Sequence, residues 1–430
     1  MHLQLPYGAG SIPWDAPADR VILSRIDAFR PVKSGRELVA DAVANPIGGP
    51  SLASLAAGKR TATVLISDHT RPVPSQDILP PLLAELRRGN PDIDVTLLVA
   101  TGCHRGTTWE ELAQKLGTVI LHQEKIVVHD AFDPRSNVEI GILPSGAPLV
   151  IDRLATETDL LVAEGFIEPH FFAGFSGGRK SVLPGVCDRI TVLGNHCGAF
   201  IDSPMARTGV LDGNPIHRDM EAAARMARLQ SIVNVVLDGG QRTVAAFAGD
   251  WRAAHAAGVD FLRTYCQVDA IPGDVVVTTN GGAPLDQNLY QCVKGLTAAE
   301  ASANPGAVLV LCAELADGVG GEGFFRALKS CRDPAALARQ YAATSQANTA
   351  PDQWQVQILC RILAKHRIIF VTRPEMAQPI REMKMEYAAG LEEALSMAGK
   401  GQVTYIPNGV SVIVREQGRF QSNGIMHTIT

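Results

Sequence analysis

The chain carries the sequence EPHFFAGFSGGRKS at residues 168–181, directly after an apolar segment, residues 159–164, that reads DLLVAE. The apolar segment predicts a buried β-strand, and the glycine-rich stretch predicts a loop at its carboxyl end. A plain turn needs a glycine or two, but this loop also holds His170, Arg179 and Lys180. Backbone amides and basic side chains in such a loop favour an anion such as a phosphate. The stretch therefore predicts a ligand-binding loop in an α/β fold.

Two common nucleotide-binding motifs do not fit the sequence. Residues 174–181 resemble a nucleoside-triphosphate P-loop, but Arg179 stands where a second glycine must precede the lysine. Near the N-terminus, Gly8-Ala-Gly10 is followed by Pro13, where a dinucleotide fingerprint needs glycine or alanine. A kinase or ATPase stays an alternative, which the Arg179 mismatch opposes.

The composition is that of a large globular protein. The chain has 430 residues, of which 46% are hydrophobic and 19% charged, so it is long enough for two domains with substantial cores. A formal net charge of −5 without a Lys/Arg cluster argues against nucleic-acid binding. We expect a small polar substrate and no nucleic-acid partner.

The cysteines and the N-terminus indicate a reducing, aqueous location. The 8 cysteines form no CxxC pair, which argues against zinc ribbons and iron–sulfur clusters. The N-terminus lacks the pattern of a signal peptide, and no apolar run has the length of a membrane span. These features predict a cytoplasmic protein that does not insert into a membrane.

Apolar runs of strand length alternate with helical stretches, which is typical of α/β domains with largely parallel sheets. Helix signals are clear at Ser75, predicted to cap a helix that runs to Gly89, and at residues 108–117. The predicted strands are residues 62–67, 95–100, 125–129, 159–164 and 231–238, then 275–278, 308–312, 367–372, 403–406 and 410–415.

A turn-forming segment, Ile271-Pro-Gly-Asp274, separates the two series of strands, after a helix predicted over residues 251–267. We therefore expect a cofactor-binding and catalytic domain over residues 1–270 and a second α/β domain over residues 271–430. The two domains would flank an interdomain cleft and close on a hinge near residue 270.

Three predicted strands of the first domain end in loops that hold histidine or arginine: residues 68–72, 101–105 and 165–170. Because the carboxyl ends of parallel strands meet at one edge of a sheet, these loops predict one site. His104 and His170 are the candidate general acid and base, since imidazole titrates near neutral pH. Two bases on either side of one carbon suggest inversion of a stereocentre.

Further polar residues suit a small acidic substrate. Arg71 and Lys294 are candidates for binding its carboxylate, and a surface ion pair is the alternative for each. Asp68 could orient a histidine ring or cap a turn. His196 lies in Gly194-Asn-His-Cys-Gly198, and on its own it is better explained as a solvated loop residue than as a metal ligand.

Taken together, these residues resemble the nickel-dependent lactate racemase family, whose members carry a nickel-pincer nucleotide. The resemblance spans nearly the whole chain. It rests on SDHTRPVP at residues 67–74, TGCHR at 101–105, EPH at 168–170, residues 174–185, GNH at 194–196, YQCVK at 290–294 and PDQW at 351–354.

The resemblance implies a role for each motif. His104 and His170 would act as alternating acid and base, with Arg71 and Lys294 on the substrate. Lys180 would tether the cofactor and His196 would bind nickel. The remaining cofactor contacts would come from Asp68, Thr70, Ser176, Gly177, Gly178, Arg179, Tyr290, Gln291 and Trp354.

The resemblance also implies a mechanism. A 2-hydroxy acid, lactate or a larger one, would pass a hydride to the nickel-pincer nucleotide, form a planar 2-keto acid and regain hydride on its other face. Cofactor-biosynthesis proteins would be partners, so recombinant protein made without them is expected to be empty. Phe171 and Phe172 are either walls of a substrate pocket or core aromatics. The alternative function is a non-catalytic two-domain protein that binds organic or sugar acids.

Overall fold

The computed structural model describes residues 1–415, and the expected second domain extends past these residues to 430. The chain divides into two compact units, each assembled from separated segments. One unit, here the larger unit, combines Arg25–Cys266 with Gly321–Ala364. The other, the smaller unit, combines Met1–Ser24, Gln267–Gly320 and the described residues from Lys365 onward. These units differ from the contiguous division at residue 270 that the sequence suggests.

The larger unit is built on a six-stranded sheet in which five strands are parallel and β12 is antiparallel to β11. The strand order is β12-β11-β8-β3-β4-β5. The strands are β3 (Thr61–Ser67), β4 (Asp94–Ala100), β5 (Lys125–Val128), β8 (Leu160–Phe166), β11 (Leu229–Leu237) and β12 (Thr243–Asp250). All five strands predicted for the first series are therefore present, within two residues at each end.

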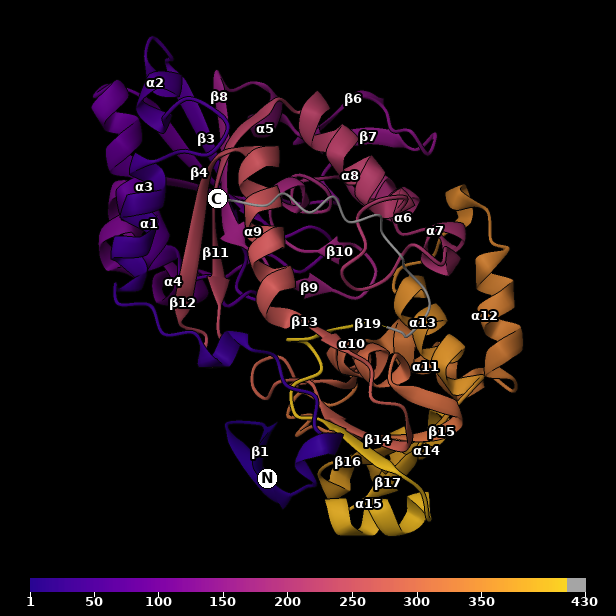
Figure 1. Cartoon of the computed structure of the whole chain (residues 1–430). Coiled ribbons are helices and arrows are strands. Elements are labelled where there is room, and N and C mark those ends of the chain that lie inside the picture. Colours follow the sequence, from indigo (N-terminus) through magenta and orange to yellow (C-terminus); the bar gives the residue numbers. More distant parts are fainter. Residues whose placement is uncertain (416–430) are drawn as a thin grey trace. The chain divides into compact units, whose positions relative to one another are not determined.

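Helices α1 (Gly35–Ala44), α3 (Ser75–Gly89) and α4 (Trp109–Gln123) pack side by side against this sheet (Figure 1). Their apolar faces join Val64, Leu97 and other buried strand residues in one core cluster. Helix α9 (Trp251–Cys266), predicted from the sequence, packs against β11 and β12. The near-continuous apolar strands reflect a parallel sheet whose neighbours keep it from water.

Two helix signals were only partly correct. Ser75 is the first helical residue, and Pro74 stands at the cap position; the Ser75 hydroxyl donates to Glu164 Oε1 at 2.9 Å. Thr108 does cap α4, in a capping box with Glu111. Gly117 breaks the helical path of α4 with φ 75°, and the chain then re-enters a helix that ends at Gln123.

The larger unit also contains shorter elements. They include the hairpin β6–β7, the ribbon β9–β10, the turn η3 and a set of short helices. Their bounds are β6 (Asn137–Ile142), β7 (Pro148–Asp152), α5 (Arg153–Thr156), β9 (Pro169–His170), β10 (Gly174–Phe175), η3 (Gly178–Ser181), α6 (Arg189–Asn195), α7 (Gly198–Asp202) and α8 (Pro215–Met226). Helices α12 (Pro334–Ala342) and α13 (Gln353–Leu363) pack against α7, which explains why residues 321–364 belong to this unit.

The smaller unit has a five-stranded parallel sheet of order β17-β16-β15-β14-β18. Its strands are β14 (Gly273–Thr279), β15 (Ala303–Cys312), β16 (Arg367–Val371), β17 (Glu386–Ala388) and β18 (Val403–Ile406). Four of the five predicted strands lie in this sheet. The fifth, β19 (Ile413–Arg415), pairs instead with β13 (Gln267–Asp269).

The start of the chain completes the smaller unit. Strands β1 (His2–Tyr7) and β2 (Gly10–Asp15) form an antiparallel hairpin, and Leu3 and Leu5 enter the same core cluster as Val275 and Val310. Helices α10 (Leu289–Glu300), α14 (Ala377–Glu382) and α15 (Leu391–Ala398) also belong to this unit. No helix among residues 1–415 is long and apolar enough to cross a membrane.

Candidate active site

Three neighbouring strands of the larger unit deliver the candidate residues to one edge of the sheet. Strands β8, β3 and β4 are adjacent and parallel, so their carboxyl ends lie together. Asp68 follows β3, His104 follows β4, and His170 follows β8. The arrangement of the three loops at one sheet edge is therefore as the sequence predicts.

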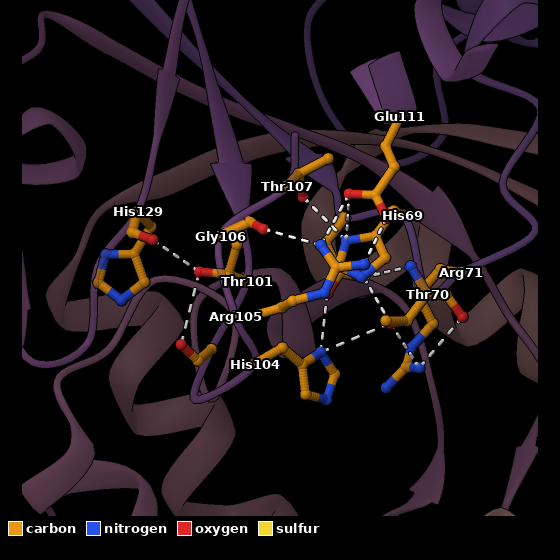
Figure 2. Close-up of polar contacts among 12 residues, drawn as sticks. His69, Thr70, Arg71, Thr101, His104, Arg105, Gly106, Thr107, Glu111 and His129 are labelled. Carbon is orange, nitrogen blue, oxygen red and sulfur yellow. Dashed lines mark hydrogen bonds and ion pairs between the residues drawn. The ribbon is translucent and has the colours of Figure 1, made fainter. Parts of the chain in front are cut away.

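Asp68 and His104 form a close polar contact at this edge. His104 Nδ1 lies 2.7 Å from Asp68 Oδ2, while the Thr70 hydroxyl donates to Asp68 Oδ1 at 2.6 Å. Figure 2 shows the His104 ring beside Thr70 and Arg71. The Asp68 side chain is 2% exposed and the His104 side chain 43% exposed. The carboxylate is thus hidden behind a ring that faces open space.

Charge and hydrogen bonding keep Asp68 ionised in spite of its burial. Burial alone raises the pKa of the Asp68 carboxyl, but the hydrogen bond from His104 and the charges of His104 and Arg71 outweigh it. The net effect holds the pKa of Asp68 well below its usual range. An ionised Asp68 accepts the Nδ1 proton of His104 and leaves Nε2 of that ring as a proton acceptor.

Arg71 is held by the same turn. Its NH1 group donates to the Thr70 hydroxyl at 3.0 Å, and the buried Lys115 donates from α4 to the Arg71 carbonyl at 3.2 Å. Burial lowers the pKa of Lys115, against the attraction of Glu164 and Asp68. The turn that carries Asp68, Thr70 and Arg71 is therefore held in place by a hydrogen bond from the Lys115 ammonium group.

Several residues that sequence reasoning missed fasten the His104 loop. Arg105 pairs with Glu111, and its hydrogen bond outweighs the opposing effect of burial and lowers the pKa of Glu111 to about 2. His69 Nδ1 lies 3.1 Å from the Thr107 hydroxyl (Figure 2). The only sequence signal for this group is the Thr108-x-x-Glu111 capping box, which places Glu111 near the loop.

A hollow of about 340 Å³ lies beside His104. Its lining alternates polar and apolar residues, and the Cys103 thiol is part of it. Burial raises the pKa of Cys103 to about 11, so this thiol is protonated and unreactive near neutral pH. The lining residues are Cys103, His104, Arg105, Gly106, Val128, His129, Asp130 and Phe132.

His170 lies in the β9–β10 ribbon, paired with Gly174. Its Nδ1 accepts a hydrogen bond from the Ala173 amide at 3.3 Å. The ring stacks on Phe171, with centroids 5.0 Å apart, and meets the edge of Phe172 at 4.5 Å. Phe171 and Phe172 are 7% and 4% exposed, so they are buried aromatics that orient the His170 ring. In a neutral ring of this kind the proton lies on Nε2.

His196 is buried among aromatic rings at the end of α6. Its ring centroid is 5.1 Å from that of Phe172 and 5.0 Å from that of Trp354 on α13. Nδ1 donates to the Val192 carbonyl at 3.1 Å, which leaves Nε2 with a lone pair. Burial, together with the charge of Lys180, lowers the pKa of His196 to about 3. The ring is therefore neutral near pH 7, as metal ligation requires.

The glycine-rich loop is bound tightly to the protein interior. Gly177 and Gly178 have φ of 75° and 53°, and the Gly178 amide donates to Asn234 Oδ1 on β11 at 2.8 Å. A Cβ on Gly178 would lie 2.9 Å from the His255 ring, so a side chain does not fit there. The Ser176 hydroxyl accepts from the Glu168 amide at 2.9 Å. The Lys180 ammonium lies 5.7 Å from the Phe172 ring centroid.

Arg179 points into the protein, which differs from the phosphate contact that the sequence predicts for it. The residue is 1% exposed. Its Nε donates to His217 Nδ1 at 3.0 Å, NH2 donates to the Ala173 carbonyl at 2.9 Å, and NH1 lies 3.0 Å from His255 Nε2. Burial lowers the pKa of Arg179 to about 9. The side chain thus braces the loop from inside rather than meeting an anion outside it.

The other predicted site residues are divided between the larger and the smaller unit. Trp354 contacts His196 within the larger unit. Tyr290, Gln291 and Lys294 lie on α10 of the smaller unit, where the Gln291 amide bonds to the cap residue Asn288 at 3.0 Å. The roles predicted for these three residues stay predictions.

A metal at His196 would not be held by a cluster of protein ligands alone among the described residues. Among residues 1–415, no group of three or more His, Cys, Asp or Glu side chains could hold a metal ion. The neighbouring Cys197 is buried, and burial raises the pKa of its thiol, which disfavours the thiolate form. Further ligands would have to come from a bound group.

Comparison with known proteins identifies relatives over nearly the whole chain. Residues 7–209 match the model of the lactate racemase N-terminal domain, and residues 268–414 match that of the lactate racemase C-terminal domain. A lactate racemase of Thermoanaerobacterium thermosaccharolyticum is 47% identical over 97% of this chain and 100% of its own length. A lactate racemase of Lactiplantibacillus plantarum is 48% identical over 92% of this chain and 94% of its own length.

Solved structures agree with the fold. The lactate racemase apoprotein of T. thermosaccharolyticum superposes with a TM-score of 0.92, covering 97% of this chain and 100% of that one at 47% identity. A Thermotoga maritima protein that is 17% identical superposes with a TM-score of 0.65 over 89% of this chain and 97% of its own, a likeness of fold alone.

Proposed function

Because the chain belongs to the lactate racemase family, we propose that it interconverts the stereoisomers of a 2-hydroxy acid, with lactate as the first candidate substrate. The observation that carries the proposal is the opposite hydrogen bonding of the two histidines. His104 donates from Nδ1 to Asp68, whereas His170 accepts at Nδ1 from a backbone amide. One ring is thereby set to take a proton while the other is set to give one.

The two rings divide the proton transfers of a racemisation. A 2-hydroxy acid must lose its hydroxyl proton and its Cα hydrogen to become a planar 2-keto acid, and it regains both to form either enantiomer. His104 takes the hydroxyl proton at Nε2, and Asp68 stabilises the imidazolium that results. His170 carries its proton on Nε2 in the neutral ring, so it donates a hydrogen bond to the substrate oxygen. It acts as the base for the opposite enantiomer only once that proton has moved to Nδ1, and the ring that takes the hydroxyl proton then returns it. The two rings have different hydrogen-bond partners, Asp68 for His104 and the Ala173 amide for His170. Different partners suit two rings that act on opposite sides of one substrate.

In the larger unit, Arg71 is the candidate for binding the carboxylate of the substrate. NH1 of its guanidinium is held by Thr70 at 3.0 Å, so the planar fork is oriented before substrate arrives. A carboxylate matches this fork with two parallel hydrogen bonds. Fixing the carboxylate fixes Cα and its hydroxyl group, which is what stereochemical inversion needs. Lys294 stays a second candidate on sequence grounds.

The residues present fit a nickel-pincer nucleotide. The His196 ring is neutral, lies among buried aromatic side chains and has a lone pair on Nε2. Lys180 lies in the glycine-rich loop, and its charge helps to lower the pKa of His196. His196 would ligate the nickel and Lys180 would tether the nucleotide. The Ser176 and Gly178 amides already donate to the Glu168 carbonyl and to Asn234 Oδ1, so the phosphate contact expected of this loop stays a prediction. When bound, this group supplies the hydride acceptor and donor that protein side chains lack. Phe172 and Trp354 keep water from the His196 ring.

The decisive experiment is chiral chromatography of 2-hydroxy acids incubated with protein loaded by the cofactor-biosynthesis proteins. We expect each single enantiomer of the true substrate to approach a racemic mixture. Lys180→Ala should abolish both the conversion and the mass increase on the protein. Conversion by Lys180→Ala at the wild-type rate would contradict the proposed tether.

The same panel separates the alternative function. A two-domain protein that only binds organic or sugar acids would bind members of the panel without turnover, even when it carries the cofactor. Binding by calorimetry together with unchanged enantiomeric composition would favour that alternative. Magnesium-dependent nucleotide hydrolysis by pure protein would instead revive the kinase or ATPase reading.

A further inference from the structure

A buried histidine and a buried aspartate outside the proposed chemistry form an ion pair next to it. His129 Nδ1 lies 3.0 Å from Asp152 Oδ2, with side chains 0% and 4% exposed. His129 Nε2 lies 3.1 Å from the Cys187 carbonyl. Asp152 Oδ1 accepts from the Leu154 amide at 3.0 Å and so caps α5. The pair is fully bonded and hidden from solvent.

Both ring nitrogens of His129 face acceptors. A carbonyl oxygen can only accept, and so can an ionised carboxylate, so each of the two contacts takes its proton from the ring. A buried pair of this kind is weak evidence for stability, because well-packed apolar residues often replace one without loss. What matters here is which two segments of the chain the hydrogen bonds of the pair connect.

On one side, the pair is fastened to the loop that carries His104. The His129 amide donates to the Val99 carbonyl at 3.1 Å, near the end of β4. The Thr101 hydroxyl donates to the His129 carbonyl at 2.8 Å, a contact drawn in Figure 2. His129 therefore fixes the first residue of the loop 101–105.

On the other side, the pair is fastened to the segment that follows Lys180. His129 Nε2 holds Cys187, and the Asp152 amide donates to the Val186 carbonyl at 2.9 Å. The two segments also touch directly, because the Gly102 amide donates to the Gly185 carbonyl at 2.8 Å. The charged pair thus spans from the β4 loop to the residues just beyond the glycine-rich loop.

We propose that His129 and Asp152 are a positioning pair that sets the spacing of His104 from Lys180. The inference deepens the proposed function and rests on it. Neither residue touches the reacting atoms; each acts by locking two loops against one another. A displacement on the order of 1 Å in such a site lowers a rate by about 10²-fold. The pair therefore controls turnover rather than cofactor attachment.

The test compares His129→Leu and His129→Asn with the control His366→Gln. Leucine removes both hydrogen bonds, whereas the asparagine amide takes the place of Nδ1 and keeps the bond to Asp152. His366 is a matched control because it is also buried and bonds a carbonyl, that of Ala307 at 3.2 Å, but lies in the smaller unit.

Two measurements on protein without cofactor test whether the pair holds the two segments together. Nitrogen NMR of the His129 ring should find both nitrogens protonated in the wild type. Hydrogen exchange should find the Gly102 amide protected in the wild type and exchanging at least tenfold faster in His129→Leu, with His129→Asn between them. An unprotonated ring nitrogen, or unchanged exchange at Gly102, would overturn the inference.

Kinetics of the loaded enzyme examine the consequence. We expect kcat of His129→Leu to fall about 10- to 100-fold with KM nearly unchanged, full adduct mass at Lys180, and partial recovery in His129→Asn. Wild-type kcat in His129→Leu, or an equal loss in His366→Gln, would overturn the positioning role. If His129→Leu does not fold, the kinetics of His129→Asn and the NMR of the wild-type ring test the positioning role. An inactive wild type would contradict the proposed function instead, while hydrogen exchange at Gly102 would still test whether the pair holds the two segments together.

Discussion

His104 Nδ1 lies 2.7 Å from Asp68 Oδ2, and the carboxylate that it meets is almost entirely buried. This contact fixes the protonated nitrogen of the ring, because the carboxylate is ionised and can only accept. The exposed nitrogen, Nε2, is thereby left as the base. The base at Nε2 therefore depends on a buried carboxylate on the other side of the ring.

The first prediction concerns Asp68→Asn. The amide can donate to Nδ1 and so shift the His104 proton to Nε2, which removes the base. We expect kcat to fall about 10²- to 10⁴-fold with little change in stability. Asp15→Asn is the matched control, since Asp15 pairs with His2 at 3.0 Å on the exposed surface. Steady-state rates in both directions check it, and an equal effect of the two substitutions would contradict it.

A second prediction separates the tether from the metal ligand. In protein loaded with the cofactor, His196→Ala should retain the mass adduct on Lys180 but lose most of its nickel. Lys180→Ala should lose the adduct. Intact-mass spectrometry and metal analysis of the same samples give both quantities. If His196→Ala retains nickel at the wild-type ratio, another residue ligates the metal. His366→Gln, another buried histidine, should keep both.

Acid should destabilise the protein through His217. Burial, with the charges of Arg179 and Arg252, lowers the pKa of His217 to about 3 in the folded state. In the unfolded chain the pKa is about 6.5, so between these values only the unfolded chain binds the proton. The free energy of unfolding therefore falls as pH drops below about 6.5, by up to roughly 1.4 kcal/mol per pH unit for this group.

The check is urea denaturation of wild type and His217→Gln from pH 7 to pH 4. Glutamine does not titrate, so the pH dependence should be shallower by about one proton. The exposed His2 gives the control, because His2→Gln should leave the slope unchanged. Parallel slopes for wild type and His217→Gln would mean that His217 titrates equally in both states.

The fourth prediction concerns the glycine-rich loop. Gly178→Ala combines a positive φ of 53° with a Cβ only 2.9 Å from the His255 ring. Gly146→Ala meets the strain alone, because φ there is 89° and nothing lies within 4 Å of a Cβ. We expect Gly146→Ala to cost about 1 kcal/mol of stability. Gly178→Ala should cost clearly more and should prevent adduct formation at Lys180. Equal thermal shifts would show that the clash is relieved.

Much of the fold was predictable because the pattern of each strand is local. The runs that became β3, β4, β8 and β14 are mostly apolar, and each holds at least five buried residues in succession, as is typical of strands covered on both faces. The helix start at Thr108 was also predictable, since its capping box lies within four residues. Local signals of this kind need no knowledge of the tertiary structure.

What could not be predicted depends on partners distant in sequence. Ser75 looks like a helix cap, but Glu164 from β8 accepts its hydroxyl. Arg179 looks like an anion ligand, but His217 on α8 and His255 on α9 enclose its guanidinium. Neither histidine stands near Arg179 in the chain. The same holds for His129 and Asp152, which are 23 residues apart.

The discontinuous smaller unit has a consequence for how the polypeptide is made. Leu3 and Leu5 are synthesised long before Ile369, their partner in the same core cluster. At roughly 5–20 residues per second, translation of the intervening stretch takes on the order of 20 to 70 seconds. During that time the N-terminal hairpin has apolar side chains without their final neighbours, so the nascent chain offers a binding segment for chaperones before the enzyme can complete itself.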